Sequence, residues 1–249
     1  MKKLVFFVLF LTLALSLASC YRESGVLDEA RDFSVSGEVH SLDIRINAAD
    51  FKIEYGESFA VESNLKMLSV STDSGVLKIV DEAKGPVSYT NATLTLVIPE
   101  GTVFEDVRIK TGAAKLTASS ISSKNLDFVL GAGDVYIGSL WVSAEAEIDG
   151  GAGQITVMDG SISNLSLEMG VGELDMRVAL LGDSEMEFGV GETSLTLLGG
   201  RDNYKVEMKG GVGGIFVDGE KVTDFGIGGV GQNEIEIKGG VGEINLFFE

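Results

Sequence analysis

The chain has 249 residues, of which 38 are acidic and 19 basic, and its formal net charge of −19 opposes binding to nucleic acid. Its single cysteine excludes an internal disulfide, and its single histidine, His40, leaves no Ser-His catalytic pair within the repeats. A folded part of about 210 residues is large enough to bury a continuous core without a disulfide.

Residues 1–19 have the features of an export signal. Lys2 and Lys3 precede an apolar stretch from Leu4 to Leu17, which is short for a membrane-spanning helix. The stretch ends in Leu17-Ala-Ser-Cys20 and resembles a bacterial lipoprotein signal, in which the cysteine becomes the first residue of the mature protein. The resemblance implies that lipid on Cys20 anchors the exported chain to a membrane of the bacterial envelope. The other interpretation is an ordinary secretory signal with an incidental cysteine.

Residues 20–37 carry several charges and few periodic apolar residues, so we expect a tether after the lipidated cysteine. Tyr21 is not the aspartate that often retains lipoproteins at the inner membrane, which favours the outer membrane or cell surface if the cell has two membranes. Without Lys2 and Lys3, 17 basic residues stand against 38 acidic ones, a net charge of −21. This charge favours cationic partners such as metal ions or basic peptides. Acidic residues at outward strand positions would also keep a flat sheet soluble, with no partner implied.

Residues 38–249 are expected to form one domain, because no change in composition divides them. Near its start, Ile44 and Ile46 alternate with polar residues, and Phe51 and Ile53 continue the pattern after a corner at Asn47-Ala-Ala-Asp50. The segment between Ala48 and Ala113 offers room for about three less regular coils.

A repeat of about 20 residues governs the rest of the domain. Each unit is an alternating strand, a small residue that usually lies between glycines, and a second alternating strand. The small residues that mark the units are Ala113, Ala132, Ala152, Val171, Val190, Val212, Val230 and Val241. The period is too short for a crossover helix, so it predicts strands that stack in parallel from coil to coil, about 4.8 Å apart.

The alternation changes its parity at each marker. Leu165, Leu167 and Met169 are predicted to point inward before Val171, whereas even-numbered residues from Leu174 onward point inward after it. By the same reasoning Ala132 and Val190 are counted among inward residues. A period-2 strand cannot change parity without a bend or bulge, and glycine suits such a corner because it accepts positive φ and close backbone approach.

These features predict an all-β fold, a single β-solenoid resembling a parallel β-helix, with about 20 residues per coil and Gly-Ala/Val-Gly corners. An antiparallel β-sandwich is the competing fold, but the constant one-residue slip favours stacked coils. Val230 and Val241 are separated by only about half of the period, which suggests that the last coil is shortened into a hairpin or cap. The apolar Leu246-Phe-Phe248 would then lie at the open end of the stack.

Candidate chemistry is sparse. The Gly-x-Gly strings precede strands rather than helices, so they do not predict a nucleotide site, and we expect no cofactor. Asp134, Glu173 and Glu192 follow the corners and would form a row about 5 Å apart, yet the row is interrupted and no metal site is expected. No catalytic residues can be singled out.

Two further residues are candidates for an interaction surface. Trp141 either stacks on a partner or covers the core at a turn. Arg201 lies in a stretch that makes one coil longer than its neighbours, and loops that interrupt a repeat are reasonable contact points.

The pattern as a whole resembles the bacterial putative-adhesin domain family of unknown function, a β-solenoid of the cell envelope. The resemblance rests on Leu42-Asp-Ile-Arg-Ile46, Leu94-Thr-Leu-Val-Ile-Pro99, Val107-Arg-Ile-Lys-Thr-Gly112 and the Gly-Ala/Val-Gly coils that follow. It covers about residues 40–249. It implies a fold and an envelope location, and some members of the family are linked to envelope stress, but it supplies no catalytic or binding residues.

We therefore expect an envelope lipoprotein, not an enzyme, that presents a solenoid surface for adhesion or protein interaction. Its partners would be the membrane through lipid on Cys20, and envelope proteins, cationic peptides or glycans. The alternative is a component of envelope stress that captures cationic antimicrobial peptides. A polysaccharide-active enzyme of the β-helix type is a further alternative.

Overall fold

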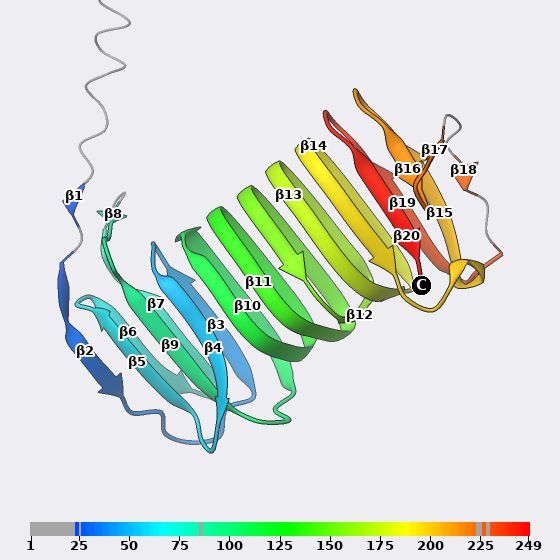
Figure 1. Ribbon diagram of the computed structural model, residues 1–249. Coiled ribbons are helices and arrows are strands. Elements are labelled where there is room, and N and C mark those ends of the chain that lie inside the picture. The colour runs from blue at the N-terminus through cyan, green and yellow to red at the C-terminus, as the bar shows by residue number, and fades with distance from the viewer. Residues whose placement is uncertain (1–22, 25, 85–86, 223–225, 228–229) are drawn as a thin grey trace, which may run out of the picture.

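The computed structural model describes residues 23–24, 26–84, 87–222, 226–227 and 230–249. Most of these residues lie in strands, which wind into an elongated stack of coils (Figure 1). The central coils pair in parallel at nearly the offset of the sequence repeat, so that Gln154 lies beside Glu173 and Glu173 beside Glu192. The predicted all-β solenoid is therefore confirmed.

Twenty strands and one short 3-10 helix make up the described chain. They are β1 (Glu23–Ser24), β2 (Leu27–Phe33), β3 (Ser41–Ile46), β4 (Asp50–Gly56), β5 (Ala60–Leu65), β6 (Leu68–Asp73), β7 (Val76–Asp81), β8 (Val87–Ser88), β9 (Thr93–Pro99), β10 (Phe104–Ala113), β11 (Lys115–Val157), β12 (Gly160–Ser163), β13 (Leu165–Leu181), β14 (Asp183–Leu197), η1 (Arg201–Asn203), β15 (Tyr204–Lys209), β16 (Ile215–Val217), β17 (Glu220–Val222), β18 (Gly226–Ile227), β19 (Asn233–Lys238) and β20 (Ile244–Phe248).

A regular coil has three sides, which are clearest in β13. Residues 165–169 form one side, here called face A, and the corner 170–172 leads to residues 173–178 on face B. Residues 179–181 then pair with β12 on a short third side, face C. Because the strands of successive coils pair side by side, each face is a flat parallel sheet that runs along the stack.

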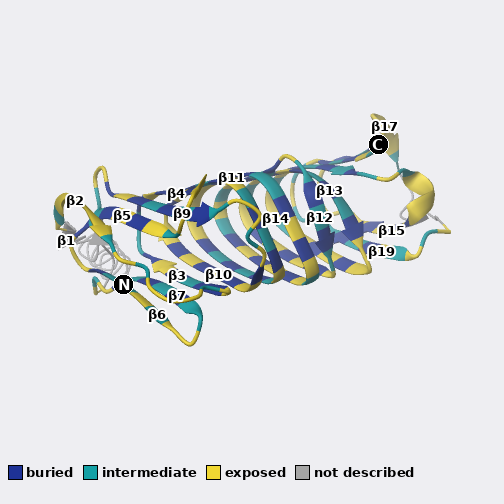
Figure 2. Ribbon diagram, turned by 90° about the horizontal axis from the view of Figure 1, so that it is seen from below, coloured by how far each residue is buried: buried dark blue, intermediate teal, exposed yellow. Residues whose placement is uncertain are grey.

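The interior is a continuous apolar core that follows the predicted alternation. Leu165, Leu167 and Met169 are buried before the corner of β13, and Leu174 and Met176 are buried after it. Figure 2 shows the result as bands of buried and exposed residues that alternate along every coil. The predicted change of parity is confirmed, and it occurs across Gly170–Gly172.

Glycines at the corners allow adjacent coils to come into close backbone contact. A Cβ added at Gly170 would collide with the carbonyl oxygen of Gly151, and one added at Gly172 would collide with that of Gly153. Gly172 also has φ 148°, which disfavours any other residue. Equivalent contacts recur in neighbouring coils and form two columns. These are Gly112, Gly131, Gly151, Gly170, Gly189, Gly240 and Gly211 in the first, and Gly133, Gly153, Gly172, Gly191, Gly242 and Gly213 in the second.

The small residue between the two glycine columns faces solvent, which corrects the prediction for Ala132 and Val190. Ala132 is exposed, and Val190 and Val171 are 50% and 56% exposed. The backbone turns within the Gly-x-Gly corner, so the residue between the glycines points away from the core. The inward alternation thus stops before the marker residue and not at it.

The C-terminal coil does not lie at the end of the stack, contrary to the prediction. Strand β19 pairs with β14 on one side and β15 on the other, and β20 lies in the same way between β14 and β16. The C-terminal coil is therefore inserted between two coils that precede it in sequence. Leu246 is buried there rather than exposed at an open end. Val230 is 93% exposed and lies outside the corner row, which explains its short spacing to Val241.

The N-terminal coil is inserted in the same manner. Strand β3 lies between β7 and β10, and β4 lies between β9 and β11. The chain between Ala48 and Ala113 adds one further parallel layer, β7 with β9, and not the predicted three coils. Two more strands of this segment, β5 and β6, run antiparallel to β9 and β7, and the short β8 pairs in parallel with β1.

Antiparallel strands complete both ends of the stack. Strand β2 pairs with β5 at the N-terminal end, while β17 and β18 pair with β16 and β15 at the other. Residues 27–33 lie within the predicted tether, and as β2 they pack on the domain rather than extend from it. Short or charged terminal strands of this kind discourage association edge to edge.

The buried carboxylate of Asp81 connects segments at the N-terminal end. It accepts hydrogen bonds from Asn47 Nδ2 at 3.0 Å, from the Ala83 backbone N–H at 3.2 Å and from the Tyr89 hydroxyl at 3.1 Å. Burial, reinforced by the negative charge of Asp81, raises the pKa of Tyr89 to about 12.

We predict that Gly172→Ala lowers the free energy of unfolding by at least about 3 kcal/mol, since its methyl group collides with a backbone carbonyl and its φ is strained. Gly101→Ala is the matched control, because Gly101 has φ 80° but no atom within 4 Å of an added Cβ. Urea unfolding of both variants separates the two contributions. Equal losses would show that φ, and not contact between coils, sets the requirement for glycine.

We also predict that Tyr89→Phe destabilises the domain by roughly 1.5–3 kcal/mol at neutral pH, because a hydrogen bond to a buried carboxylate is lost. The folded-state pKa of Tyr89 lies above its ordinary value of 10, so its contribution is complete below pH 10 and declines as the pH rises toward 12. Unfolding experiments across this range should show a steeper alkaline loss for the wild type than for the variant. Parallel pH profiles would contradict this assignment.

Candidate interaction surfaces

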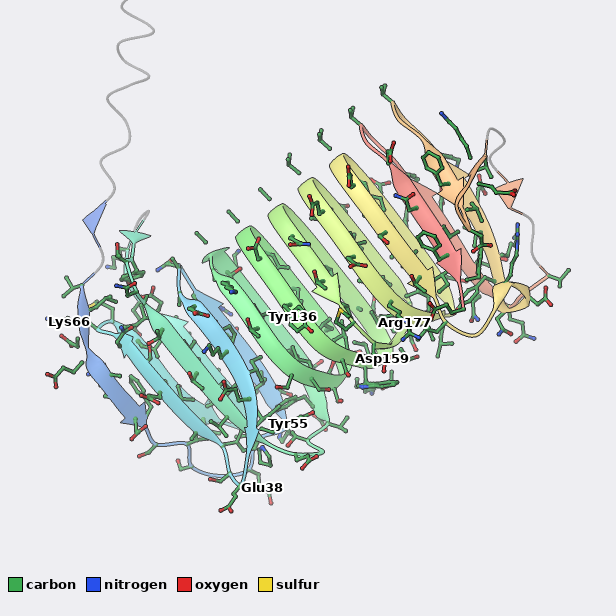
Figure 3. All side chains as sticks on the ribbon, viewed as in Figure 1. Glu38, Tyr55, Lys66, Tyr136, Asp159 and Arg177 are labelled. Carbon is green, nitrogen blue, oxygen red and sulfur yellow. The ribbon has the colours of Figure 1, made fainter. Side chains whose placement is uncertain are left out.

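Outward side chains gather into rows because successive coils pair in register. Figure 3 shows side chains projecting outward along the length of the stack, with Tyr136, Asp159 and Arg177 among those labelled. The rows differ in chemistry from face to face, so each face is a separate candidate surface.

Face A is acidic over its C-terminal half. Its outward carboxylates form the acidic patch, defined by Glu145, Glu147, Asp183, Glu185, Glu187, Glu207, Glu234 and Glu236. Six of them line a shallow open groove of about 430 Å³ that crosses β13, β14, β19 and β15. At the N-terminal end of the same face the charges alternate, as in the pair Arg108–Asp127 at 2.6 Å.

Three lysines neutralise part of the acidic patch. Lys205 contacts Glu234 at 2.9 Å, and Lys209 contacts Glu236 at 2.8 Å. Lys238 contacts Glu187 at 2.8 Å and also pairs with Glu185. Hydrogen bonds to these two glutamates raise the pKa of Lys238, and the hydrogen bond from Lys209 lowers the pKa of Glu236. The patch nevertheless keeps more carboxylates than lysines, so it stays negative.

The predicted corner row forms on face B. Glu173 lies between Gln154 and Glu192 in the paired register, and all three are exposed. Asp134 precedes Gln154 in the same row, because Gly153 stacks on Gly133 one coil earlier. Within the described part of the chain, no three or more His, Cys, Asp or Glu side chains are grouped suitably for a metal ion.

A ridge of exposed valines runs beside this row, and sequence reasoning missed it. Val171, Val190, Val241 and Val212 follow one another along the corner, each in register with the next. Of these valines, only Val190 was predicted to point inward, because the alternation of the preceding strand was extended to it. The two flanking glycines were the available signal, because a residue held between them cannot follow the inward direction of either strand.

Face C carries the one tryptophan of the chain. Trp141 pairs with Ser161, and its side chain is 45% exposed, so it does not simply cover the core. Arg201 lies instead in η1, near the C-terminal end, with its guanidinium carbon 5.6 Å from the centre of the Phe248 ring. The predicted residues thus form no single site: the corner acids share face B, Trp141 is on face C, and Arg201 is at the end of the stack.

Comparison with known proteins assigns the architecture. Residues 33–246 match the Toastrack DUF4097 family. The chain belongs to this family. The membership and the fold confirm the resemblance to the putative-adhesin domain family. No curated protein matches the sequence.

Solved structures resemble this Toastrack protein along nearly their whole length. A structure named as a putative adhesin of Bacteroides fragilis is 12% identical, with a TM-score of 0.54, and the match covers 90% of this chain and 99% of that one. A putative cell adhesion protein of Clostridium sporogenes is 18% identical over 89% and 99% of the two chains, with a TM-score of 0.44. A putative adhesin of Parabacteroides merdae is 12% identical over 92% and 99%, with a TM-score of 0.48.

Two features of the Toastrack chain relate to membrane attachment. Cys20, the predicted site of lipidation, lies outside the described residues. Among the residues that are described, none belongs to an apolar helix of membrane-spanning length.

Proposed function

We propose that this Toastrack protein is a lipid-anchored component of the bacterial cell envelope, and that its solenoid is a scaffold for adhesion or protein interaction without catalysis of its own. The observation that carries the proposal is the exterior of the stack, where exposed rows repeat in register over a core that they do not help to form. Outward positions of this kind can vary to suit a partner while the fold is retained.

The form of the surface supports contact with large partners. Among the described residues, the groove on face A is open, and the two slits beside the glycine columns hold only about 30 and 10 Å³. Small-molecule sites are usually concave and bury most of the ligand. The adhesin name of the Bacteroides fragilis structure is consistent with an interaction role.

Attachment in the proposal depends on Cys20. Lipid on this residue, followed by the segment up to β2, would hold the N-terminal end of the stack near the membrane. The faces of the solenoid, which run along the stack, would then remain accessible to partners.

We predict that Cys20→Ser moves the protein from the membrane fraction to the soluble fraction, because one or more acyl chains are lost. Fractionation of cells that express each form, together with mass spectrometry of the mature N-terminus, measures this. In-cell crosslinking of the lipidated wild type should then recover defined envelope proteins or glycans. An unlipidated Cys20 would contradict the anchor, and a lipidated protein with no crosslinked partner at any surface would contradict the scaffold.

A second candidate function is the capture of cationic antimicrobial peptides, and the acidic patch favours it. Glu145 and Glu147 form no ion pair with the described residues, and they extend the patch beyond its lysines. A basic peptide that lies across face A would gain from the combined field of these carboxylates.

For this second function we predict micromolar binding of a basic peptide to the mature domain, weakened about tenfold or more when the ionic strength rises from about 0.02 to 0.3 M. The double substitution Glu145→Gln and Glu147→Gln should weaken binding of the peptide relative to the wild type at the same ionic strength. Glu54→Gln, at the N-terminal end of face B, is the control and should not. Isothermal titration measures the affinities, and binding that is absent or insensitive to salt would rule this function out.

A further inference from the structure

We infer that the part of face C centred on Trp141 is a binding site for a neutral glycan, which stacks on the indole and hydrogen-bonds to the surrounding serines. The inference rests on the proposed interaction function and specifies a ligand class for one face. It starts from the side chains that surround Trp141.

Serine occupies the nearest outward positions on all four sides of the indole. Ser139 and Ser143 are the next outward residues along the strand on either side, and Ser161 is the paired residue on the next coil. On the preceding coil the neighbour is Ser122, because Gly138 stacks on Ser119 and the same offset carries Trp141 onto Ser122. An exposed aromatic ring is thus framed by four short hydroxyl side chains.

These hydroxyls are available to a ligand. Within the described part of the chain, none of the four makes a side-chain hydrogen bond to another residue; of the buried serines, Ser63 and Ser184 do so and Ser123 does not. A serine hydroxyl both donates and accepts, which matches the hydroxyl groups of a sugar. The ring supplies apolar contact area at a low cost in side-chain entropy, while serines adapt their hydrogen bonds to the ligand.

The charge of the neighbourhood favours a neutral ligand. The outward residues that frame the ring carry no charge, in a chain whose net charge without Lys2 and Lys3 is −21. The nearest charged positions, Lys124 and Asp159, are of opposite sign, and Asp159 pairs with Arg177 at 3.5 Å. A polyanionic glycan would be repelled by the molecule as a whole, and a cationic ligand would be drawn to the acidic patch on face A.

A glycan also suits this surface better than a protein does. Aromatic hot spots in protein interfaces lie in desolvated pockets and are surrounded by further contacts that exclude water. Trp141 is flanked instead by serine hydroxyls and is 45% exposed, so it does not lie in a desolvated pocket. Two other exposed large apolar side chains lie on this part of the stack: Met158 is on the next coil, three residues before Ser161, and Leu181 is two coils away.

Because Trp141 is the only tryptophan, its fluorescence reports directly on the site. Mature protein is titrated with neutral hexasaccharides, namely cellohexaose, mannohexaose and chitohexaose, and with an anionic oligogalacturonate. We expect a saturable change in emission with at least one neutral sugar, unchanged by added salt, and no response to the anionic sugar. The absence of a response to every neutral sugar would overturn the inference.

Variants then locate the binding, with affinities measured by isothermal titration. Trp141→Ala should weaken it about tenfold or more, and Trp141→Phe less, because a smaller ring keeps part of the stacking. Ser161→Glu, which places a charge beside an intact indole, should also weaken it and serves if Trp141→Ala fails to fold. Tyr136→Ala is the matched control, since Tyr136 is 46% exposed on face B. A loss in Tyr136→Ala equal to that in Trp141→Ala would overturn the inference.

The test also separates this inference from the scaffold proposal. If no neutral sugar binds but Trp141→Ala loses a crosslinked protein partner in cells, the scaffold stands and the glycan assignment is wrong. If a neutral sugar binds through Trp141 and the lipidated protein still crosslinks to no partner, the glycan site stands without the scaffold.

Discussion

The close contact between backbone atoms at the corners is the constraint on which the rest of the structure depends. At each Gly-x-Gly corner, carbonyl oxygens of one coil occupy the space that a Cβ of the next coil would need. Only glycine permits this approach, and the positive φ of residues such as Gly172 and Gly191 turns the chain from face A to face B at the same level in each coil that has a Gly-x-Gly corner. Once the corners superpose, the strands on either side pair in parallel register, and the inward side chains fill one continuous core.

The contacts between corner glycines and backbone carbonyls also show the spatial order of the coils. Gly240 stacks on Gly189, and Gly211 stacks on Gly240, although Gly211 precedes Gly240 in the sequence. Coils that share one corner geometry are interchangeable neighbours, so the last coil can lie between two earlier ones without a change in its local structure. The N-terminal coil, β3 with β4, does the same at the opposite end. In both places the outermost layer can then continue into antiparallel strands, which end the stack without leaving a terminal coil uncovered.

This explains how much could be predicted from the sequence. Burial of Leu165, Leu174 and their equivalents follows from period-2 alternation, and the corners follow from glycine. The order of the coils could not be predicted, because the repeat pattern specifies how two adjacent coils pack but not which two coils of the chain are adjacent. Val230 was also misleading: it has glycines on both sides, yet it is 93% exposed and lies outside the corner row. The exposure of Val190 could not be predicted either, because it depends on how the corner turns, and the turn is set by contact between the paired coils.

The candidate surfaces show a similar division. The corner acids could be placed in one row from the period alone, because a period carries every outward residue to the same face. The serines around Trp141 could not be grouped in this way, since Ser139 and Ser143 are neighbours along one strand whereas Ser161 comes from the next coil.

Face C, the shortest of the three, has little sequence per coil and therefore little pattern to detect. A distinctive residue such as Trp141 is free to occur there because neither the glycine columns nor the core depends on that outward position. The regular part of the repeat thus explains the fold, and the departures from it on exposed faces are where specific recognition can be encoded.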